Sequence, residues 1–529
     1  MKQTDRCKSG QSRFLSPTRA KKRILIVNGF FDEMRFAIGR NTQVPQAMGP
    51  VYLAGAFSPH MCEIQLYSEM YSGPLEDEKL LSWPDMLVLT GLNTAFDRML
   101  HLTAYARTKN KKIVVVAGGP AIRVLPTLSK RYFDFACLGD IEELQKVVEE
   151  VFGKRYVNIK MSPRHDLAYW MNHFGYVESS RYCNFKCSFC SLTMEGYKYQ
   201  KYDLDIIRRQ IVGLGKRKDP IVFIDNNFYG DNRQFFLDRL ELIKELRKDG
   251  YIKDWSALVT GDFFYNDENL KLVKEAGCIG LFSGLESFDT GWLQTVNKLQ
   301  NTKISQLEMV HKCLDSGIVF LYGCMLDVAR RHLVDIRREL EFIFDTADIT
   351  LPSYLSIIVP ILGTPLFYDC LDKELILPLT KLRDLESTTL SVKPLDSIRE
   401  VTKFIYDIQT LKGYKRQILR HSWGFFRKYK SVLSHFQMAV ALSNATKISF
   451  QFTLNKFVVP NSFRPRNRHR THLSTTEILD SVYRPAFHVD SIYESYFKPT
   501  YLTDQFGAIS EDLVPDIVKS RLQSEAVHG

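Results

Sequence analysis

Short apolar runs alternate with stretches of helical periodicity over the first part of the chain. The runs that predict strands are 23–28, 62–67, 86–91, 112–118 and 133–139, and the helical segments between them fall near 50–57, 96–109, 121–130 and 141–152. Strands that are apolar throughout and separated by helices indicate a parallel sheet covered on both faces. We therefore predict a doubly wound α/β domain over residues 23–153, with ligands bound beyond the carboxyl ends of its strands.

A second alternating unit follows residues 154–172, which lack clear periodicity and are interpreted as a linker. Its predicted strands are 174–180, 220–226, 255–261, 279–286, 319–326 and 354–360, and its helices fall near 203–215, 232–249, 266–276, 302–317 and 333–348. In the clearest helix, 232–249, the apolar residues Phe236, Leu240, Ile243 and Leu246 recur behind Asp231, the expected N-cap. Six strand–helix units over residues 173–369 predict a partial (β/α)6 barrel, with its chemistry at the carboxyl ends of the strands.

The alternation stops after about residue 370. Periodic segments near 397–412 and 424–446 predict a mostly helical region over residues 370–529, a candidate substrate- or partner-binding region. Its last part is too aromatic for a disordered tail, and we expect it to pack back on the barrel. The aromatic residues concerned are Tyr483, Phe487, Tyr493, Tyr496, Phe497 and Tyr501.

Composition supports a multi-domain globular protein. The chain has 529 residues, of which 45% are hydrophobic and 25% charged, which argues against a disordered, collagenous or coiled-coil protein. No run approaches the ~18 apolar residues of a transmembrane helix, and the first residues lack the apolar core of a signal peptide. The expected compartment is therefore cytoplasmic.

The net charge of +11 is concentrated at the N-terminal tail and in the last third of the chain. Residues 1–22 carry seven basic residues against Asp5, and we interpret them as a flexible, solvated tail. They lack interleaved aromatic residues, so they give no strong evidence for nucleic-acid binding. The basic run 464–470 fits either a solvated loop or a segment that neutralises an anionic substrate or a membrane surface.

Three of the ten cysteines form the strongest chemical signal. Cys183, Cys187 and Cys190 have C-x3-C-x2-C spacing directly after the first strand of the second unit. Thiolates select zinc or iron–sulfur centres, and no fourth ligand of a tetrahedral zinc site is evident nearby. A 4Fe-4S cluster held by three cysteines leaves one iron open, which fits better. The other seven cysteines are scattered and predict buried thiols rather than a disulfide framework.

At these residues the sequence resembles the radical S-adenosylmethionine (radical SAM) superfamily, whose signature has this spacing and commonly an aromatic residue before the last cysteine, here Phe189. The resemblance implies that the open iron binds S-adenosylmethionine and that electron transfer from the cluster yields a 5′-deoxyadenosyl radical. It also implies an electron donor such as flavodoxin or ferredoxin. The cofactor carries the difficult chemistry and the protein orients it.

Further motifs similar to this family follow in order at the strand ends. Asp225, after the second strand, resembles groups that contact the amine of S-adenosylmethionine. Glu286, in a G-x-E-S motif after the fourth strand, is implied to accept the ribose hydroxyls. Gly363 and Thr364 stand in a segment similar to the family's P-G-T-P motif near the adenine, with Leu362 in place of a proline. At residues 260–262 the chain lacks the arginine that relatives often place there for the cofactor carboxylate.

The first domain resembles the cobalamin-binding domain that precedes the barrel in one branch of the superfamily. Thr90, Gly118, Gly119 and Gly139 lie at strand ends where such domains hold the corrin. The family's D-x-H-x-x-G motif is absent, because residues 31–36 contain no histidine, so cobalamin would be bound without a histidine ligand or not at all. His60 and His101 are interpreted as ordinary, partly exposed residues.

The resemblance implies a cobalamin-dependent methyltransferase that acts on an unactivated carbon or phosphorus centre of a small-molecule or natural-product-like substrate. A second hypothesis keeps the radical chemistry but replaces methyl transfer by cyclisation, rearrangement or oxidation, with a first domain that does not bind cobalamin. A third is a non-catalytic binding protein whose cysteines hold zinc. The substrate, the electron donor and the oligomeric state are not predicted by the sequence.

Overall fold

The computed structural model describes residues 21–30, 47–160, 162–171, 174–216, 219–385, 389–409, 413–444, 485 and 487–528. Most of the predicted N-terminal tail, residues 31–36 and the basic run 464–470 lie outside these described residues. Within the described ranges, no helix is long and apolar enough to cross a membrane.

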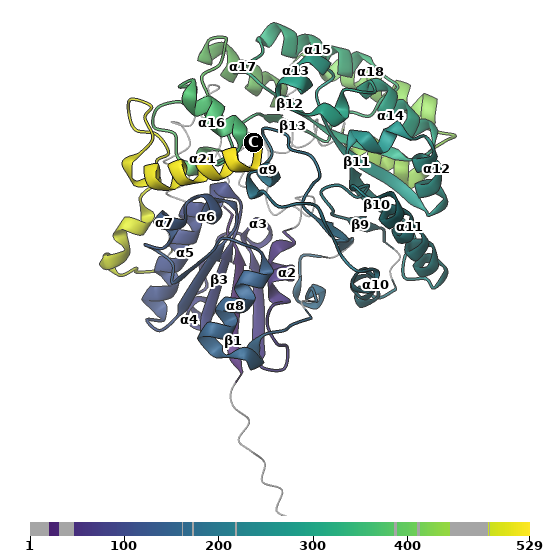
Figure 1. The fold of residues 1–529 in the computed structure, drawn as a ribbon. Coiled ribbons are helices and arrows are strands. Elements are labelled where there is room, and N and C mark those ends of the chain that lie inside the picture. Colours follow the sequence, from purple (N-terminus) through teal and green to yellow (C-terminus); the bar gives the residue numbers. More distant parts are fainter. Residues whose placement is uncertain are drawn as a thin grey trace, which may run out of the picture.

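The first domain is built on a five-stranded parallel sheet (Figure 1). The strands are β1 (Lys22–Asn28), β2 (Cys62–Ser68), β3 (Met86–Thr90), β4 (Val114–Gly118) and β5 (Phe135–Cys137). Their order is β2-β1-β3-β4-β5, and their apolar side chains are buried on both faces. This confirms the doubly wound sheet predicted from the continuous apolar runs.

Helices cover both faces of this sheet. They are α2 (Gly49–Ala54), α3 (Glu69–Ser72), α4 (Glu78–Ser82), η1 (Asn93–Ala95), α5 (Phe96–Lys109), α6 (Pro120–Val124), α7 (Pro126–Ser129) and α8 (Ile141–Phe152). The single helix predicted over 121–130 is wrong: it is broken at Leu125 (φ −116°, ψ 55°) into α6 and α7. Pro126 explains the break, because proline disfavours the helical conformation in the preceding residue.

The segment 154–172 contains the short helices η2 (Lys154–Tyr156) and η3 (His165–Leu167). Tyr156 and Trp170 are buried in the same apolar cluster as strand β1. The described part of this segment is therefore packed on the first domain, while its role as a domain boundary stays a prediction.

The second unit is a six-stranded parallel half-barrel of order β13-β12-β11-β10-β9-β6, as predicted. Its strands are β6 (Gly175–Val177), β9 (Ile221–Phe223), β10 (Trp255–Val259), β11 (Cys278–Glu286), β12 (Val319–Leu326) and β13 (Tyr354–Ile357). A small antiparallel pair, β7 (Ser180–Arg181) and β8 (Gln200–Lys201), flanks the first strand. The six strands therefore lie side by side in one open, curved sheet, in the order in which they follow along the chain.

The elements outside this sheet are α9 (Ser191–Glu195), α10 (Leu204–Gly213), α11 (Arg233–Lys248), η4 (Gly261–Tyr265), α12 (Glu268–Glu275), α13 (Thr290–Thr295), η5 (Leu299–Asn301), α14 (Gln306–Asp315) and α15 (Leu333–Asp345). The four apolar residues predicted for the inner face of α11 are buried. Its N-cap is not Asp231, as predicted, but Asn232, which is extended and accepts a hydrogen bond from the Phe235 N–H (2.8 Å). Asp231 lies one residue too early for this bond.

The C-terminal region contains α16 (Pro365–Asp372), η6 (Leu382–Asp384), α17 (Ile398–Gln409), α18 (Lys415–Tyr429), a helical stretch over 435–444, η8 (Ser491–Phe497), η9 (Glu511–Leu513) and α21 (Val514–His528). The prediction near 397–412 matches α17. The helix predicted over 424–446 has wrong bounds: α18 starts earlier, and Ser434 caps a new helix by accepting from the Gln437 N–H (3.3 Å).

The last residues pack mainly on the first domain, not on the barrel as we expected. The Phe497 ring stacks on His101 of α5 (4.8 Å between centroids), and the Asp516 carboxylate accepts from the backbone N–H of Thr127 and Leu128 (2.9 Å each). His101 is consequently buried, whereas His60 lies exposed in a turn. Figure 1 shows α21, in yellow, beside α6 and close to α16. Helix α5 of the first domain supplies the surface on which the aromatic rings of Phe487 and Phe497 pack.

Candidate active site

The loop that carries Cys183, Cys187 and Cys190, called the cysteine loop below, follows β7. Hydrogen bonds hold it in place from two sides. The backbone N–H of Ser188 donates to the Val296 carbonyl (3.0 Å), and the Asn297 side chain donates to the Lys186 carbonyl (2.7 Å). From the other side, the Leu366 N–H donates to the Ser188 carbonyl (2.9 Å). The loop is therefore fixed between the segment after β11 and the start of α16.

One sulfur atom of the loop accepts a hydrogen bond from a polar side chain of η5. The Gln300 amide donates to Cys187 Sγ (3.3 Å), and the Cys187 carbonyl accepts from the Cys190 N–H (3.1 Å). Burial raises the pKa of Cys183 to about 12 and that of Cys190 to about 11. These two thiols are therefore neutral on their own, and a bound metal centre would deprotonate them.

The donor set fits an iron–sulfur cluster. Within the described ranges, no three Cys, His, Asp or Glu side chains converge on a single ion. A cubane cluster does not require such convergence, because each cysteine binds a different iron atom. Three thiols on one short, anchored loop therefore suit a 4Fe-4S cluster, with Cys183, Cys187 and Cys190 as its ligands.

Glu286 is a buried carboxylate close to the cysteine loop, with which it is connected through Lys298. It ends β11 with φ +66°, an unusual value for a residue other than glycine, and it is buried. One carboxylate oxygen pairs with Lys298 Nζ (2.9 Å), while Oε2 is buried with no hydrogen-bond partner. A buried oxygen without a partner is costly unless a ligand uses it, so the geometry suits the acceptor of hydroxyl groups that we predicted.

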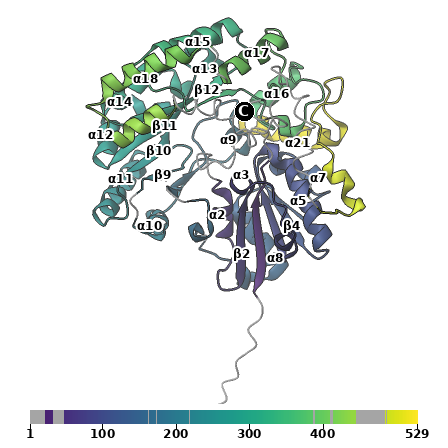
Figure 2. The same cartoon turned by 180° about the vertical axis from the view of Figure 1, so that it is seen from behind.

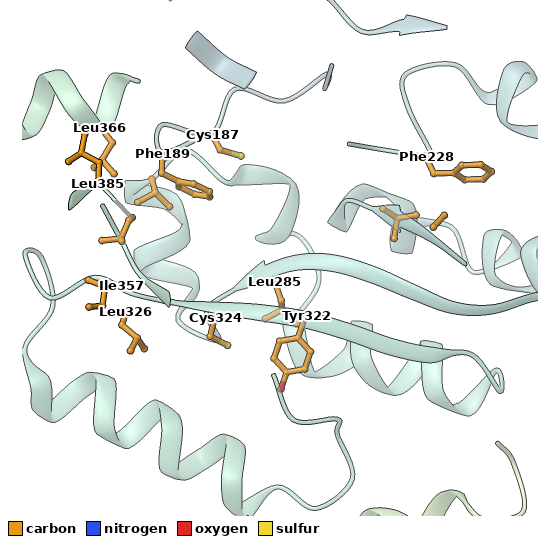
Figure 3. Close-up of a cluster of buried hydrophobic side chains, with 14 of the residues drawn as sticks. Cys187, Phe189, Phe228, Leu285, Tyr322, Cys324, Leu326, Ile357, Leu366 and Leu385 are labelled. Carbon is orange, nitrogen blue, oxygen red and sulfur yellow. The ribbon is translucent and has the colours of Figure 1, made fainter. Parts of the chain in front are cut away.

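Lys298 is a site residue that sequence reasoning missed. Its ammonium lies between the Glu286 carboxylate and the Phe189 ring, 5.5 Å from the ring centroid. Burial lowers the pKa of Lys298, but Glu286 and the nearby thiols outweigh it, so that the pKa is raised and the side chain stays charged. Figure 3 shows Phe189 on the cysteine loop beside Leu366 and Leu385. Lys298 thus connects the carboxylate to the cysteine loop.

Asp225 lies in a buried network of hydrogen bonds. Its carboxylate is fully buried, accepts from the Ser179 hydroxyl (2.7 Å) and the Ser180 hydroxyl, and lies 3.6 Å from the Arg239 guanidinium. Contact with the amine of S-adenosylmethionine stays a prediction. The neighbouring Asn227 instead donates to Asn184 of the cysteine loop (2.8 Å), which ties the second strand end to the predicted cluster ligands.

The predicted adenine segment lies where three elements meet. Gly363 has φ +80°, and a Cβ there would lie 2.8 Å from Val124 of α6 and 2.9 Å from Met194 of α9. Thr364 is buried, and its hydroxyl caps α16 by accepting from the Phe367 N–H (3.2 Å). The glycine is required by both backbone conformation and space. The contact of these two residues with adenine stays a prediction.

The loop after β10, where relatives often carry an arginine, contains no basic residue. The Thr260 hydroxyl bonds to Asp262, and burial raises the pKa of that carboxyl group. This loop packs against Gln300 and Asn301, since a Cβ on Gly261 would collide with both. It supports the stretch that carries Lys298.

A cavity of about 380 Å³ lies where the carboxyl ends of both sheets meet. All four residues predicted for cobalamin, Thr90, Gly118, Gly119 and Gly139, line it. The barrel contributes Glu178, Arg181, Tyr182, Leu192, Glu195 and Asn226. The two domains therefore share one site.

The first domain contributes glycine backbone and apolar side chains to this cavity. Gly119 has φ +117°, and a Cβ there would lie 2.7 Å from the Gly91 carbonyl oxygen. Apolar walls come from Leu53, Val88, Val116 and Leu144. No histidine is among the described lining residues, and burial raises the pKa of the lining Cys137 to about 12.

The barrel side of the cavity carries the charged residues Glu178, Arg181 and Glu195, and the first domain adds Arg123 and Asp140. Tyr182, with φ +63°, hydrogen-bonds to Asp140 of the first domain, and Arg181 lies 3.3 Å from Glu142. Burial raises the pKa of Glu178 to about 7, although Arg181 opposes the shift. These contacts join the two domains directly at the cavity.

Comparison with known proteins agrees with this geometry. Residues 177–340 match the model of the radical SAM superfamily, which covers the cysteine loop and most of the half-barrel. Residues 177–340 therefore form a domain of the radical SAM superfamily. Two solved radical SAM structures share the fold of this chain.

Those two structures are TsrM from Kitasatospora setae with tryptophan and a S-adenosylmethionine analogue bound, and OxsB with aqua-cobalamin and S-adenosylmethionine bound. The first has a TM-score of 0.56 at 14% identity and covers 82% of this chain and 99% of that one. The second has a TM-score of 0.55 at 15% identity and covers 96% of this chain and 80% of that one. At these identities the likeness shows the fold.

Curated sequence relatives carry methyltransferase names. An uncharacterized methyltransferase of Synechocystis is 25% identical over 318 residues, 56% of this chain and 57% of that protein. Hopanoid C-2 methylase of Rhodopseudomonas palustris is 23% identical over 294 residues, 51% of this chain and 54% of that protein. Bacteriochlorophyllide d C-12(1)-methyltransferase of Chlorobaculum tepidum is 29% identical over 208 residues, 37% of this chain and 42% of that protein. The chain spans about half the length of the curated relatives it matches.

Proposed function

We propose that this protein is a radical SAM methyltransferase that uses cobalamin to methylate an unactivated carbon or phosphorus centre. One observation carries the proposal: the shared cavity touches the cysteine loop. Tyr182, which precedes Cys183, and Leu192, two residues after Cys190, both line the cavity. Any occupant of the cavity therefore lies against the loop that carries the predicted cluster ligands.

The side chains of this protein suit both the binding of an iron–sulfur cluster and the binding of S-adenosylmethionine. The cluster with S-adenosylmethionine would supply a reductively formed radical, and cobalamin would supply a methyl carrier. The three cysteines would hold the cluster, and Gln300 donates an N–H to one of their sulfurs. Glu286 presents its unpartnered Oε2 as an acceptor for hydroxyl groups, and Lys298 fixes the other oxygen. The tight packing around these groups limits the access of water.

The cavity suits a corrinoid in its chemistry. Glycine backbone at the strand ends allows close approach of a ligand, and the apolar walls suit a flat macrocycle. With no histidine among the described lining residues, we propose that cobalamin is bound without a histidine ligand. The cavity alone is smaller than a whole corrinoid, so the proposal also requires the adjoining edge of the first sheet.

The names of the relatives support methyl transfer, and the absent D-x-H-x-x-G motif favours the second hypothesis, radical chemistry without cobalamin. Product analysis separates them. The anaerobically prepared protein is incubated with S-adenosylmethionine and a chemical reductant. Reductive cleavage releases 5′-deoxyadenosine, and removal of the methyl group releases S-adenosylhomocysteine.

We expect both products from the parent. Cys187→Ala should abolish 5′-deoxyadenosine, and Gly118→Leu, which fills the cavity, should abolish S-adenosylhomocysteine. Gly118→Ala is the matched control, because its Cβ would meet Cys137 at an ordinary 3.6 Å. 5′-Deoxyadenosine alone would support the second hypothesis. Neither product, together with bound zinc, would support the third hypothesis of a non-catalytic zinc protein.

A further inference from the structure

Helix α18 is attached to the barrel by one face. Its buried residues are Ile418, His421, Phe425 and Tyr429, at the spacing of a single helical stripe. Gly424 allows close packing, since a Cβ there would lie 2.6 Å from the Ala347 Cβ. The Tyr429 hydroxyl donates to the Asp348 carbonyl (3.0 Å). These contacts fix which face of the helix points away from the barrel.

The opposite face is also apolar. Leu419 is 72% exposed, Trp423 63% and Phe426 37%, and the rings of Trp423 and Phe426 stack with centroids 6.0 Å apart. The exposed Val432 and Phe436 follow just beyond the helix. Figure 2 shows α18 on the outer side of the barrel helices, beside α14 and α15. A stable helix in water does not need a second apolar face, so this one points to a binding surface.

The same face is strongly basic. Residues 415–430 contain six basic residues and no acidic one, namely Lys415, Arg416, Arg420, Arg427, Lys428 and Lys430. Arg420 pairs with Asp345 (2.7 Å) and Lys428 with Asp348 (3.0 Å). Among the described residues, Lys415, Arg416, Arg427 and Lys430 have no ion-pair partner, and all four are exposed. At 100° per residue they flank Leu419, Trp423 and Phe426 on one arc.

We propose that this outer face of α18 binds the surface of an anionic lipid membrane. The exposed apolar side chains would enter the boundary between headgroups and acyl chains, and the four unpaired cations would contact lipid phosphates. The aliphatic Leu419 and Val432 favour lipid over nucleic acid as the occupant, because they cannot stack on bases as Trp423 and Phe426 could. The inference does not depend on the chemistry proposed for the active site.

Helix α21 provides an internal comparison. It exposes Val514, Val518 and Leu522, but its charged residues include Asp516 as well as Lys519 and Arg521. Arg521 is neutralised by Asp372 (2.8 Å). Among the described side chains of α21, Lys519 is the one cation without an ion-pair partner, against four on α18, so α21 is expected to bind anionic lipid much more weakly and supplies the matched control.

The test is flotation of the full chain with phosphatidylcholine vesicles, with and without phosphatidylglycerol. We expect binding only to the anionic vesicles, decreasing as salt is added. The double variant Leu419→Ser/Trp423→Ser should bind about tenfold more weakly, and Arg416→Gln/Arg427→Gln, which removes two of the four unpaired cations, should lose about half of the salt-dependent part. Leu522→Ser should bind like the parent. Unchanged melting temperature and circular dichroism would show that the variants fold.

Tryptophan fluorescence reports on the surface directly. All five tryptophans lie in the described ranges, and Trp423 is the exposed one. Anionic vesicles should shift the emission of the parent to the blue, and Trp423→Phe should bind but lose the shift. Failure of the parent to bind, binding of the double variant equal to the parent, a shift that survives Trp423→Phe, or displacement from vesicles by an oligonucleotide would each overturn the proposal.

Discussion

The two parallel sheets end at the same cavity but contribute to it by different means. The barrel contributes the charged side chains Glu178, Arg181 and Glu195 to the cavity wall, and elsewhere in the site it holds the buried Glu286–Lys298 pair. The first sheet presents glycine backbone and apolar walls around Gly118 and Gly119. The barrel edge is therefore mainly charged, whereas the edge of the first domain is mainly glycine backbone and apolar side chains, with Arg123 and Asp140 as its charged groups. Substitutions on the barrel side should therefore act by removing a charge partner, and substitutions on the other side by filling space.

The largest effect should follow from breaking the charged pair on the barrel side. Lys298→Met would leave the Glu286 carboxylate buried without a partner, and we expect the free energy of unfolding to fall by about 3 kcal/mol. Chemical denaturation measures this. Lys244→Met, at an exposed ion pair with Glu241, is the control and should change stability little. Equal stability of the Lys298→Met variant and the parent would show that the pair does not hold this edge together.

A backbone substitution tests the other edge. Gly119→Ala should cost about 2 kcal/mol, because φ is positive and the new Cβ would lie against the Gly91 carbonyl. Gly73→Ala is a matched control: its φ is +96°, but a Cβ there would meet nothing within 4 Å. Thermal unfolding of both variants compares them. If Gly73→Ala cost as much as Gly119→Ala, the close approach at the cavity would contribute nothing.

Ligand binding sharpens the contrast. Glu286→Gln removes the charge and replaces one acceptor oxygen by a donor, so S-adenosylmethionine affinity should fall about tenfold. Equilibrium dialysis of the anaerobic protein would measure it, with Glu245→Gln, at an exposed pair with Arg208, as the control. Unchanged affinity in the Glu286→Gln variant would remove Glu286 from the proposed ribose site.

The smallest expected effect concerns pH. The folded pKa of Glu178, about 7, exceeds the ordinary value of 4.5. Between these values the folded chain binds more protons than the unfolded chain, so this group makes stability fall as the pH rises through that window. Glu178→Gln keeps an acceptor for the Tyr202 hydroxyl and should gain about 1 kcal/mol of stability relative to the parent between pH 6 and pH 7. Chemical denaturation of the variant and the parent at both pH values measures this gain. If the difference in the free energy of unfolding between the two proteins were the same at both pH values, the raised pKa of Glu178 would be contradicted.

Much of the fold could be predicted from the sequence, because the apolar pattern reflects burial in both parallel sheets. Helices α5 and α8 have the predicted bounds, and the strand-end positions Thr90, Gly118, Gly119 and Gly139 meet in one cavity. Parallel strands bring their carboxyl ends to one edge regardless of their separation in sequence. The cysteine triad and Glu286 could be singled out for the same reason.

The missed features depend on contacts through space. Lys298 and Gln300 lie in a polar stretch without periodicity, and their importance comes from Glu286 and Cys187, which only the fold brings near. A lysine twelve residues after the G-x-E-S glutamate was the available signal. The packing of the last residues on α5 and α7 was likewise hidden, because aromatic side chains specify burial but not the surface that buries them.

The central claim is that two cofactors occupy two differently built edges of one site. The most direct test is iron and cobalt content per chain in protein made without oxygen and with cobalamin supplied. We predict about four irons and about one cobalt in the parent, loss of iron but not cobalt in Cys187→Ala, and loss of cobalt but not iron in Gly118→Leu. Iron retained in Cys187→Ala, or cobalt absent from the parent or unaffected by Gly118→Leu, would contradict the account.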